Sequence, residues 1–466
     1  MKIHSAARYL PRYRITKETI ENESGNFRPA GIDEIAVPSA DEDSLTMAYE
    51  AGTKAIEAGT IDPTTIQSLY LATTTPPLEE EDIGVRLAEM LDLPSDIRIQ
   101  TLTQSTNGIG EAIRTAITTK NTALIIGSDC PHGEFDTVLG QAGGAGAAAI
   151  LLEEADISGF NDFSSYSAVF PGTRYRERGN TTTQQIGIAG YEREAYYQTI
   201  SSAIKSLDST ITEIDAIAVQ APNGVLPYRI GTQLDIAHEK IANGTIVTET
   251  GDLGSASALT GLVTAFSKDI TNTIVCTYGS GGTATAFHIN QAGKIDTKIT
   301  DKEHEEIGML TQLRQRYRVV SPEPEGGGAY VSLPSWKRTL DQRYNLLGGK
   351  CQTCNELVFP PHGACPECGE QDEYEMKSLA TEGEIIAITE IKQGGAPPEF
   401  QQFQSATGSY ASAIVTVNGP DTETVDIPVM INFVDSAPSV GDHISLTIRR
   451  LYTQEGIPRY SMKGVC

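Results

Sequence analysis

Hydrophobic and polar positions follow two different periods over residues 1 to about 290. Short apolar runs, such as Leu69–Thr75 and Ala123–Ser128, predict β-strands. Longer segments with apolar residues at helical spacing separate these runs. Because strands and helices alternate, the pattern favours an α/β fold in which helices cover largely parallel sheets.

The same order of elements occurs twice along this region. In the first half, Leu69–Thr75 and Ala123–Ser128 precede a glycine-rich hairpin that ends in Ala147–Leu152. In the second half, Ile217–Asn223 and Thr273–Ile289 repeat the order. This duplication predicts two related halves, about 1–155 and 156–290, packed face to face with a site where the strand ends meet.

The residues after 290 change in character. The segment Gln291–Ser335 is rich in charge, includes a predicted helix over Lys302–Arg318, and continues into the proline- and glycine-rich stretch Pro322–Gly328. We therefore expect residues 291–335 to be a linker that contains one helix. Trp336–Leu347 can form a short amphipathic helix after it.

The last part of the chain is predicted to be all β. Four expected strands, separated by glycine and proline turns, are Glu384–Lys392, Ser412–Val417, Pro428–Val434 and His443–Arg450. Residues 376–466 are therefore expected to form a small closed β-barrel.

Four cysteines precede this barrel in the spacing Cys-x2-Cys-x10-Cys-x2-Cys: Cys351, Cys354, Cys365 and Cys368. Two such knuckles bring four thiolates around one Zn²⁺ in a closed, structural site. Disulfide pairing is the alternative, but the chain has no apolar export signal at its start, and a reducing compartment disfavours disulfides. We expect a helix followed by a zinc ribbon over residues 336–375.

The charge of the chain limits its partners. Asp and Glu total 61 against 35 Lys and Arg, which gives a net charge of −26. Such a surface repels nucleic acid and anionic membranes, and it suits a halophilic cytosol where salt screens self-repulsion. Without a signal segment or a run of about 20 apolar residues, we expect a cytoplasmic protein.

Several segments carry a family resemblance. RYLPRYRI, GSDCPHGEFDTVLGQAGGAGAAAILL, VQAPNGVLPYRI, TGDLGSASALTGL and YGSGGTATAFHI resemble 3-hydroxy-3-methylglutaryl-CoA (HMG-CoA) synthase of the archaeal branch. Residues 336–466 resemble the DUF35-type module that accompanies thiolases. The resemblance implies a duplicated thiolase-like fold with α-β-α-β-α layers, followed by a rubredoxin-like zinc ribbon and an OB-fold barrel.

The resemblance also shows which chemical groups are missing. The family's catalytic Cys matches Ser105, its His matches Gln220, and its Glu falls at about Thr74, while Val225 replaces the basic residue after the His motif. A serine hydroxyl needs a base before it attacks, and glutamine cannot accept a proton. The catalytic residues are thus replaced in an acyltransferase fold, which predicts a pseudoenzyme but leaves enzymatic activity open.

Features that could hold acyl-CoA remain. The resemblance points to Ser105, Asn223, Asp252, Gly279, Ser280 and Gly281, and the nearby Gly251, Gly254 and Gly282 could help to form a backbone cradle for a carbonyl oxygen. Equally, these glycines could serve only close strand packing. Asp252 stands where the family has Asn, which places an anion in the turn.

Other groups have two interpretations. The arginines at 174, 176 and 178 could meet CoA phosphates or pair with carboxylates on a solvated face. The acidic run Glu79–Asp82 could begin a helix or replace the missing acid. Cys130 and His132 could mimic a nucleophile pair, whereas Cys276, His238 and His288 are expected to be structural.

Three functional hypotheses follow. The first is a non-catalytic, acyl-CoA-binding scaffold subunit that partners a thiolase (acetyl-CoA acetyltransferase), as a homodimer within a larger hetero-oligomer. The second is an active condensing enzyme or acyltransferase with a non-standard nucleophile such as Ser105. The third is nucleic-acid binding by the ribbon and barrel, which the 10 basic against 17 acidic residues of 330–466 oppose.

Overall fold

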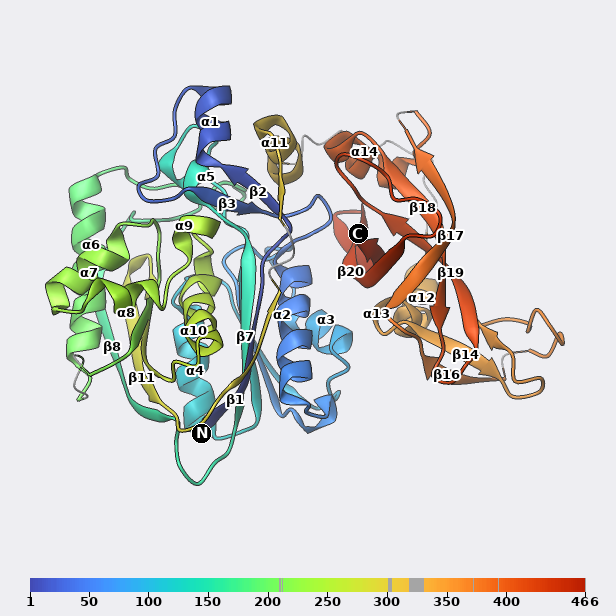
Figure 1. The fold of residues 1–466 in the computed structure, drawn as a ribbon, viewed down its shortest axis with the longest axis horizontal. Coiled ribbons are helices and arrows are strands. Elements are labelled where there is room, and N and C mark those ends of the chain that lie inside the picture. Colours follow the sequence, from blue (N-terminus) through green and yellow to red (C-terminus); the bar gives the residue numbers. More distant parts are fainter. Residues whose placement is uncertain are drawn as a thin grey trace. The chain divides into compact units, whose positions relative to one another are not determined.

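The computed structural model describes residues 1–208, 211, 213–300, 304–317, 331–371, 373–392 and 394–465 (Figure 1). They form two compact units. Unit 1 comprises Met1–Ser39 and Asp43–Gln312, and unit 2 comprises Ala40–Glu42 and Leu313–Cys466. Within the described residues, no helix combines the length and apolarity that crossing a bilayer requires.

Unit 1 contains thirteen strands in the described residues: β1 (Lys2–Tyr9), β2 (Tyr13–Thr16), β3 (Glu34–Val37), β4 (Ser68–Ala72), β5 (Arg98–Leu102), β6 (Ala123–Asp129), β7 (Gly146–Glu153), β8 (Phe160–Phe170), β9 (Ala216–Val219), β10 (Asn272–Gly279), β11 (Gly281–Asn290), β12 (Asp296–Thr300) and β13 (Glu305–Glu306). Its helices are α1 (Lys17–Ser24), α2 (Ser44–Gly59), α3 (Ile83–Met90), α4 (Gly108–Thr119), α5 (Val138–Ala142), α6 (Ala189–Lys205), α7 (Leu226–Leu234), α8 (His238–Ala242), α9 (Val247–Thr250) and α10 (Ser257–Ser267). Two 3-10 turns, η1 (Pro63–Thr65) and η2 (Gly254–Ala256), complete the unit, and α11 (Met309–Tyr317) spans its boundary with unit 2.

Two sheets dominate unit 1 and share one local arrangement. The six-stranded sheet has the order β12-β1-β7-β6-β4-β5, and the four-stranded sheet has the order β8-β11-β10-β9. In the first, β6 lies between the parallel β4 and the antiparallel β7. In the second, β10 lies between the parallel β9 and the antiparallel β11. Each half therefore presents the carboxyl ends of a parallel strand pair.

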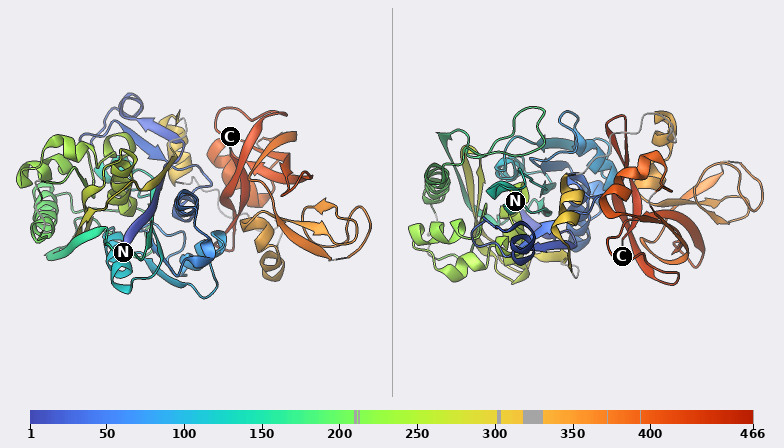
Figure 2. Two further views of the ribbon diagram at one scale, coloured as in Figure 1. Left: turned by 60° about the horizontal axis from the view of Figure 1, so that its bottom comes forward. Right: turned by 90° about the horizontal axis from the view of Figure 1, so that it is seen from above.

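Helices separate and cover these sheets. Helices α4 and α10 each contact strands of both sheets, so they form a central layer (Figures 1 and 2). Helix α2 packs on β1, β6 and β7, while α6 packs on β8, β10 and β11 from the opposite side. The layers therefore run α-β-α-β-α, which confirms the predicted thiolase-like fold.

The central position of α10 explains its composition. All residues from Ala258 to Phe266 are buried, and the segment is almost entirely apolar or small. A helix that is apolar on every side is stable only where other elements surround it. Its apolar side chains join the strands of both sheets in one core cluster.

Unit 2 consists of a small ribbon and a barrel. The elements before the barrel are α12 (Leu333–Arg338), α13 (Leu340–Tyr344), β14 (Leu347–Cys351), β15 (Leu357–Val358) and β16 (Tyr374–Ser378). The closed barrel has the order β17-β18-β19-β21-β20, with strands β17 (Glu382–Ile391), β18 (Tyr410–Asn418), β19 (Thr424–Ile431), β20 (His443–Gln454) and β21 (Ile457–Val465). The turn η3 (Pro398–Phe400) and helix α14 (Gln401–Thr407) connect β17 to β18. The predicted closed β-barrel is thus confirmed.

Buried ion pairs lie inside unit 2. The Lys463 side chain on β21 is fully buried and contacts the Asp41 carboxylate at 2.6 Å. Arg449 on β20 similarly contacts Glu42 at 3.2 Å, and both of these side chains are nearly fully buried. Residues 40–42 therefore supply the counter-ions for two buried cations of the barrel.

The expected boundary at residue 290 differs from the structure. Strand β12 (Asp296–Thr300) continues the six-stranded sheet by parallel pairing with β1, and β13 pairs with β2. Unit 1 therefore extends about twenty residues further, through Gln312. The expected helix over Lys302–Arg318 begins only at Met309, and the expected stretch Pro322–Gly328 lies outside the described residues.

The expected helix over Trp336–Leu347 also differs. It is two short helices, α12 and α13, that meet at Thr339, and Leu347 already begins β14. Leu347 pairs with Ser378 in the ribbon sheet, so the sheet ends the helical segment.

Candidate functional site

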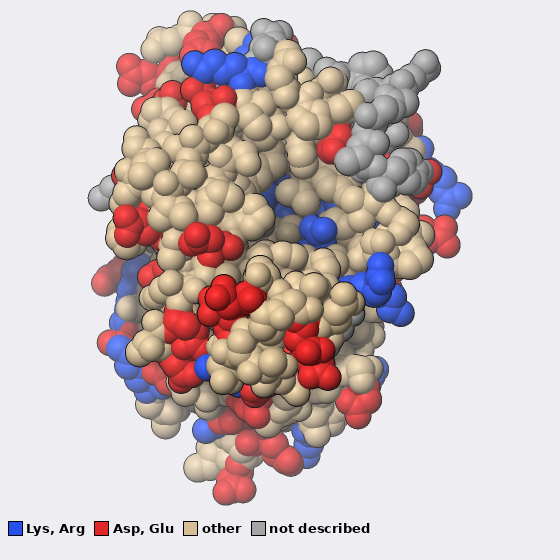
Figure 3. Space-filling view, turned by 90° about the vertical axis from the view of Figure 1, so that its right-hand side faces the viewer, with Lys and Arg blue, Asp and Glu red and all other residues tan. Residues whose placement is uncertain are grey.

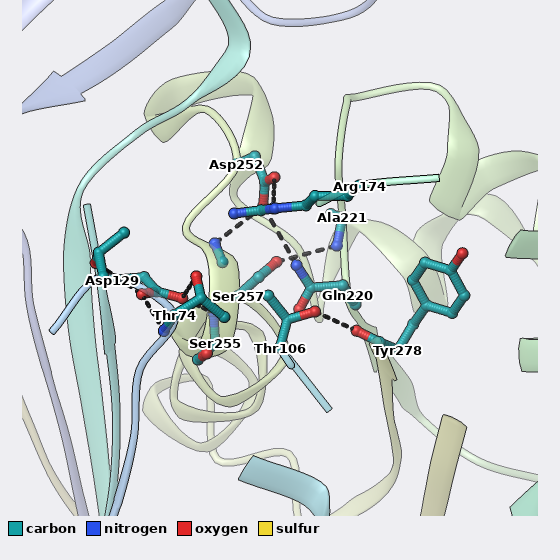
Figure 4. Close-up of polar contacts among 12 residues, drawn as sticks. Thr74, Thr106, Asp129, Arg174, Gln220, Ala221, Asp252, Ser255, Ser257 and Tyr278 are labelled. Carbon is teal, nitrogen blue, oxygen red and sulfur yellow. Dashed lines mark hydrogen bonds and ion pairs between the residues drawn. The ribbon is translucent and has the colours of Figure 1, made fainter. Parts of the chain in front are cut away.

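The three loops with the replaced residues meet in unit 1. Thr74 follows β4, Ser105 precedes α4, and Gln220 follows β9. The Thr106 hydroxyl donates to the Tyr278 carbonyl oxygen at 2.6 Å, and the Gln220 N–H donates to the Cys276 carbonyl oxygen at 3.0 Å. Both loops are thereby fixed to β10. Figure 4 shows Thr74, Thr106 and Gln220 around one region.

Ser105 lies beside a cavity but has no base. In the described part of the chain, its hydroxyl has a single hydrogen bond, from the Asn107 N–H at 3.3 Å. The adjoining cavity of about 540 Å³ is lined mostly by hydroxyl and amide side chains, including Gln104 and Ser165, and by one carboxylate, Glu111. The Glu111 carboxylate pairs with Arg114 and accepts from the Thr285 hydroxyl. In the described residues no carboxylate or imidazole is hydrogen-bonded to the Ser105 hydroxyl, so the hydroxyl is not activated as a nucleophile.

Gln220 occupies the position that the resemblance assigns to the catalytic His. Its amide group is buried and donates to the Asp252 carboxylate at 3.2 Å. The amide oxygen of Gln220 is buried without a hydrogen-bond partner. The backbone carbonyl oxygen of Gln220, by contrast, accepts from the Tyr196 hydroxyl at 2.5 Å. Burial raises the pKa of Tyr196 well above its usual value. The position thus offers amide hydrogen bonding without proton transfer.

Asp252 forms a buried ion pair with Arg174. The guanidinium donates to the carboxylate at 2.8 Å, and the exposed fractions of the two side chains are 16% for Arg174 and 4% for Asp252. The Gly254 N–H also donates to Asp252, at 2.9 Å. Burial raises the pKa of Asp252, while the Arg174 charge and the Gly254 hydrogen bond lower it. The side chains of Arg174, Asp252 and Gln220 together form one hydrogen-bonded polar group where the loops meet (Figure 4).

Thr74 is also engaged in structural contacts. Its N–H and its hydroxyl both donate to the Asp129 carboxylate, at 2.7 and 2.9 Å. Asp129, at the end of β6, is fully buried and further accepts from the Thr73 and Thr75 hydroxyls and from the Ser255 N–H. One carboxylate therefore joins the loop after β4 to the turn before α10.

We expect Asp129→Ala to lower the free energy of unfolding by at least about 2 kcal/mol, because the buried Ser255 N–H and the partly buried Thr74 N–H lose their acceptor at about 1–3 kcal/mol each. Urea unfolding measures this loss. Asp136→Ala is the matched control, because Asp136 is exposed and lies on the following loop. A loss equal to that of the control would contradict the role of Asp129 as the link between these loops.

The expected glycine cradle serves close packing. A Cβ atom at Gly279 would lie 2.0 Å from the Ser105 Oγ atom, and one at Gly282 would lie 2.0 Å from the Ala168 carbonyl oxygen. The Gly281 N–H donates to the Thr173 hydroxyl at 3.3 Å. Ser280 lies in the turn between β10 and β11. The close approach of neighbouring atoms explains Gly279 and Gly282. The Gly281 N–H already donates to Thr173, so it is not free to bind a carbonyl oxygen.

Asn223 has a capping role at α7. Its side-chain oxygen accepts from the N–H groups of Val225 and Leu226, at 2.9 and 3.0 Å. These bonds satisfy two donors that a helix start leaves open. The Asn223 oxygen is therefore committed to the fold.

The other two arginines of the loop have different contacts. Arg176 donates to the Thr74 carbonyl oxygen at 2.7 Å. The Arg178 side chain is 95% exposed and lies 3.8 Å from the Glu79 carboxylate. The expected solvated pairing with a carboxylate therefore describes Arg178, while Arg174 pairs with a buried carboxylate instead.

The remaining candidate residues make contacts that serve the fold. Asp82 ends the acidic run and caps α3 by accepting from the Gly84 N–H at 3.1 Å. The partly buried Cys130 is fixed through its N–H, which donates to the Thr75 hydroxyl at 3.0 Å. His288 on β11 contacts the Asn272 side chain at 2.9 Å, and burial lowers its pKa. Cys276 is fully buried on β10, where burial raises the pKa of its thiol.

The four ribbon cysteines converge in unit 2. The sulfur atoms of Cys351, Cys354, Cys365 and Cys368 all lie within 4.8 Å of one another. Two of the S···S distances are 3.6 Å, close to the roughly 3.8 Å that a tetrahedral zinc with bonds of about 2.3 Å requires. The backbone N–H of Cys354 stabilises the Cys351 thiolate and contributes most to lowering its pKa to about 7. The arrangement fits a closed structural zinc site.

Sequence reasoning missed two features of unit 1. It considered Arg174 only as a contact for CoA phosphates or as part of a pair on a solvated face, and it did not consider Asp129. Asp252 lies 78 residues after Arg174 in the sequence, and Asp129 bonds both to neighbours of Thr74 and to Ser255. One signal in the sequence could have indicated the ion pair. Asp252 places an anion in a turn where the family has Asn, and a buried anion requires a cation nearby.

The fold and this site define a thiolase-like protein with a zinc ribbon. A solved structure of MvaS in complex with 3-hydroxy-3-methylglutaryl coenzyme A has a TM-score of 0.57 and 18% identity, and the match covers 70% of this chain and 94% of that one. FabH, the 3-oxoacyl-(acyl carrier protein) synthase III of Pseudomonas aeruginosa PAO1, has a TM-score of 0.57 and 17% identity, with coverage of 63% and 99%. Both likenesses concern the fold.

Sequence comparison is more specific. Hydroxymethylglutaryl-CoA synthase of Thermococcus onnurineus (strain NA1) is 26% identical over 331 residues, covering 66% of this chain and 94% of that protein. The family "ChsH2, rubredoxin-like zinc ribbon domain" matches residues 338–374. The N-terminal region is thus homologous to archaeal HMG-CoA synthases, and a ChsH2-type zinc ribbon follows it.

Proposed function

We propose that this protein binds acyl-CoA without condensing it and acts as a scaffold subunit beside a thiolase (acetyl-CoA acetyltransferase). The observation that carries the proposal is the buried group of Arg174, Asp252 and Gln220. This group lies where the homologous enzymes would need a titratable imidazole. Its side chains form fixed hydrogen bonds, and the Gln220 amide cannot accept a proton from a substrate. Reactivity is lost while the surrounding fold is kept.

Acyl-CoA binding is supported by the cavity beside Ser105 and by the solved neighbours. One neighbour is an HMG-CoA synthase complexed with CoA, with a TM-score of 0.58 and 14% identity. Gly279 keeps the Ser105 hydroxyl close to β10, so the cavity retains its shape at this end. An acyl thioester there would meet hydroxyl and amide groups and the Glu111 carboxylate, but no thiolate.

The edge strands of the two sheets support a role within an assembly. Strands β5 and β8 are the last strands of their sheets in the described residues, and the cavity beside Ser105 lies between them. Open sheet edges are usual places for pairing with another chain. A second copy at these edges would give the homodimer, while the ribbon and barrel of unit 2 would bind the thiolase.

The competing function is an acyltransferase that uses Ser105. The partial exposure of Ser105 and its place at the start of α4 favour it. Its single hydrogen bond, with Asn107 as donor, opposes it, because a serine without a base is a weak nucleophile. Nucleic-acid binding has no comparable support in an acidic chain.

We expect the purified chain to bind acetyl-CoA by calorimetry, to retain no labelled acetyl group, and to form no condensation product. Ser105→Ala should change none of these results, and Ser167→Ala in the same cavity is the matched control. Retained label that Ser105→Ala abolishes would establish the acyltransferase instead. Co-purification from the native host, with the mass of the complex measured, tests the thiolase partner and the homodimer.

A further inference from the structure

The single tryptophan of the chain contacts two cationic side chains in unit 2. Trp336 on α12 is 6% exposed. The Arg343 guanidinium, from α13, is 4.1 Å from the centroid of its ring, and the Arg459 guanidinium, from β21, is 5.2 Å from the same centroid. Both distances are within the range of cation–π attraction. Two guanidinium groups thus contact one indole ring.

No carboxylate neutralises these two guanidinium groups within the described residues. Arg343 donates through Nε to the Thr339 hydroxyl at 2.9 Å and forms no salt bridge there. Arg459 is 8% exposed and likewise has no salt bridge in the part of the chain that the structure describes. Burial lowers the pKa of Arg343. In a chain with 61 acidic residues, two unpaired arginines on one ring require an explanation.

Unused hydrogen-bond donors lie at the same place. Tyr452 on β20 pairs directly with Arg459 on β21, so their side chains are neighbours. The Tyr452 ring meets Trp336 edge to face with 6.0 Å between the centroids. The Tyr452 hydroxyl and the Arg459 Nε atom are both buried without a hydrogen-bond partner. Burial raises the pKa of Tyr452, so its hydroxyl keeps its proton and remains a donor.

We propose that Arg343, Arg459, Tyr452 and Trp336 form an anion site that binds a phosphate group. A guanidinium fork matches phosphate oxygens in geometry, and the Trp336 ring holds both forks in position. A tetrahedral phosphate offers enough oxygens for two guanidinium groups and one hydroxyl, whereas a carboxylate has two. Trp336 is only 6% exposed, so the site recognises the phosphate and does not stack a base.

The partners of the site differ in exposure, and a nearby carboxylate opposes an anion. Arg343 is only partly buried, so an anion approaches from the side of Arg343, while Arg459 and Tyr452 lie in the interior. On one face of the protein, Lys and Arg side chains lie within a hollow while Asp and Glu side chains lie on the surrounding surface (Figure 3), so basic groups are open to anions in this acidic chain. Burial raises the pKa of both Tyr452 and Tyr410, and the charge of Glu399 raises both further. This carboxylate opposes a bound anion, so Glu399→Gln should strengthen binding several-fold.

The fluorescence of Trp336 tests the proposal directly, because no second tryptophan contributes. The zinc-loaded full chain is titrated with inorganic phosphate, CoA, dephospho-CoA and pantetheine at constant ionic strength. We expect saturable changes with phosphate and CoA and none with pantetheine. Equal binding of CoA and dephospho-CoA would assign the diphosphate as the bound group, and weaker dephospho-CoA binding would assign the 3′-phosphate. A change that follows ionic strength alone would overturn the site.

Two variants and a control separate binding from folding. Arg343→Gln and Arg459→Gln should each weaken phosphate binding at least tenfold, and Arg343→Gln carries the test if Arg459→Gln does not fold. Arg338→Gln is the matched control, because Arg338 is exposed on the same helix as Trp336 and should leave binding unchanged. Unaltered affinity in folded Arg343→Gln, or no fluorescence response to any phosphate compound, would refute the proposal. Unit 1 need not bind acyl-CoA for this result.

Discussion

Replacing Arg174 with Gln is expected to lower the free energy of unfolding by about 3–5 kcal/mol near neutral pH, because the substitution leaves the buried Asp252 carboxylate without its cation. The neutral glutamine keeps much of the volume of the side chain, so the loss comes mainly from charge. Urea unfolding followed by circular dichroism measures it. The proposed function depends on this ion pair, so its strength is the first quantity to determine.

A second substitution should rescue the first. In Arg174→Gln/Asp252→Asn the buried charge is gone, and we expect the double variant to recover most of the lost stability. Arg178→Gln serves as the control, since this 95% exposed side chain of the same loop should contribute no more than about 0.5 kcal/mol. If Arg174→Gln were no more destabilising than Arg178→Gln, the ion pair would be dispensable.

The pH dependence has a definite sign. Burial raises the pKa of Asp252, so the folded chain holds this proton to a higher pH than the unfolded chain does. The contribution of Asp252 to stability therefore falls as pH rises from about 4 to its raised pKa, and it is constant above that pKa. Without Arg174 the pKa rises further and this window widens. The destabilisation by Arg174→Gln should consequently be smaller at pH 5 than at pH 7.

Removing the zinc ligands should have the other large effect. We expect one Zn²⁺ per purified chain by elemental analysis, and we expect Cys365→Ser to lose the metal and to unfold the ribbon sheet of β14, β15 and β16. Structural zinc sites of this kind bind with about 10–16 kcal/mol in small domains, and that energy is folding energy. A chelator should reproduce the result in the unaltered chain.

Cys130→Ser controls for the loss of a thiol, since Cys130 lies outside the cluster and should retain one zinc per chain. Titration of free thiols in the metal-free chain distinguishes zinc from a disulfide. A reduced chain that folds its ribbon without metal, or a Cys365→Ser variant that keeps its zinc, would show that the four sulfur atoms serve another purpose.

The sequence predicted what local patterns encode. Apolar runs located β4, β6 and β7, because buried strands need continuous hydrophobic residues. The spacing of the four cysteines located the metal cluster, because zinc geometry restricts the separation of its ligands. Short strands separated by glycine and proline turns predicted the barrel, because this pattern is also local in the sequence.

Long-range pairing explains what was not predicted. Strand β12 is polar, and only its pairing with β1, almost 300 residues earlier, makes it part of the sheet. The partners of Asp129 and Asp252 are likewise set by the meeting of distant loops. A single sequence contains no periodic signal for such contacts. Residues such as Ser105, Gln220 and Asp252 could therefore be named from the sequence, while Asp129 and the bonding of the others could not.

The short stretch Ala40–Glu42 has a practical consequence for dissecting this protein. A fragment cut to begin near residue 331 would contain every strand of the barrel, yet Lys463 and Arg449 would be left in the interior with their acidic partners deleted. Such a truncation should express poorly or precipitate, although it respects the apparent domain border. Supplying the missing three residues, or neutralising both cations, would be needed to obtain the barrel alone.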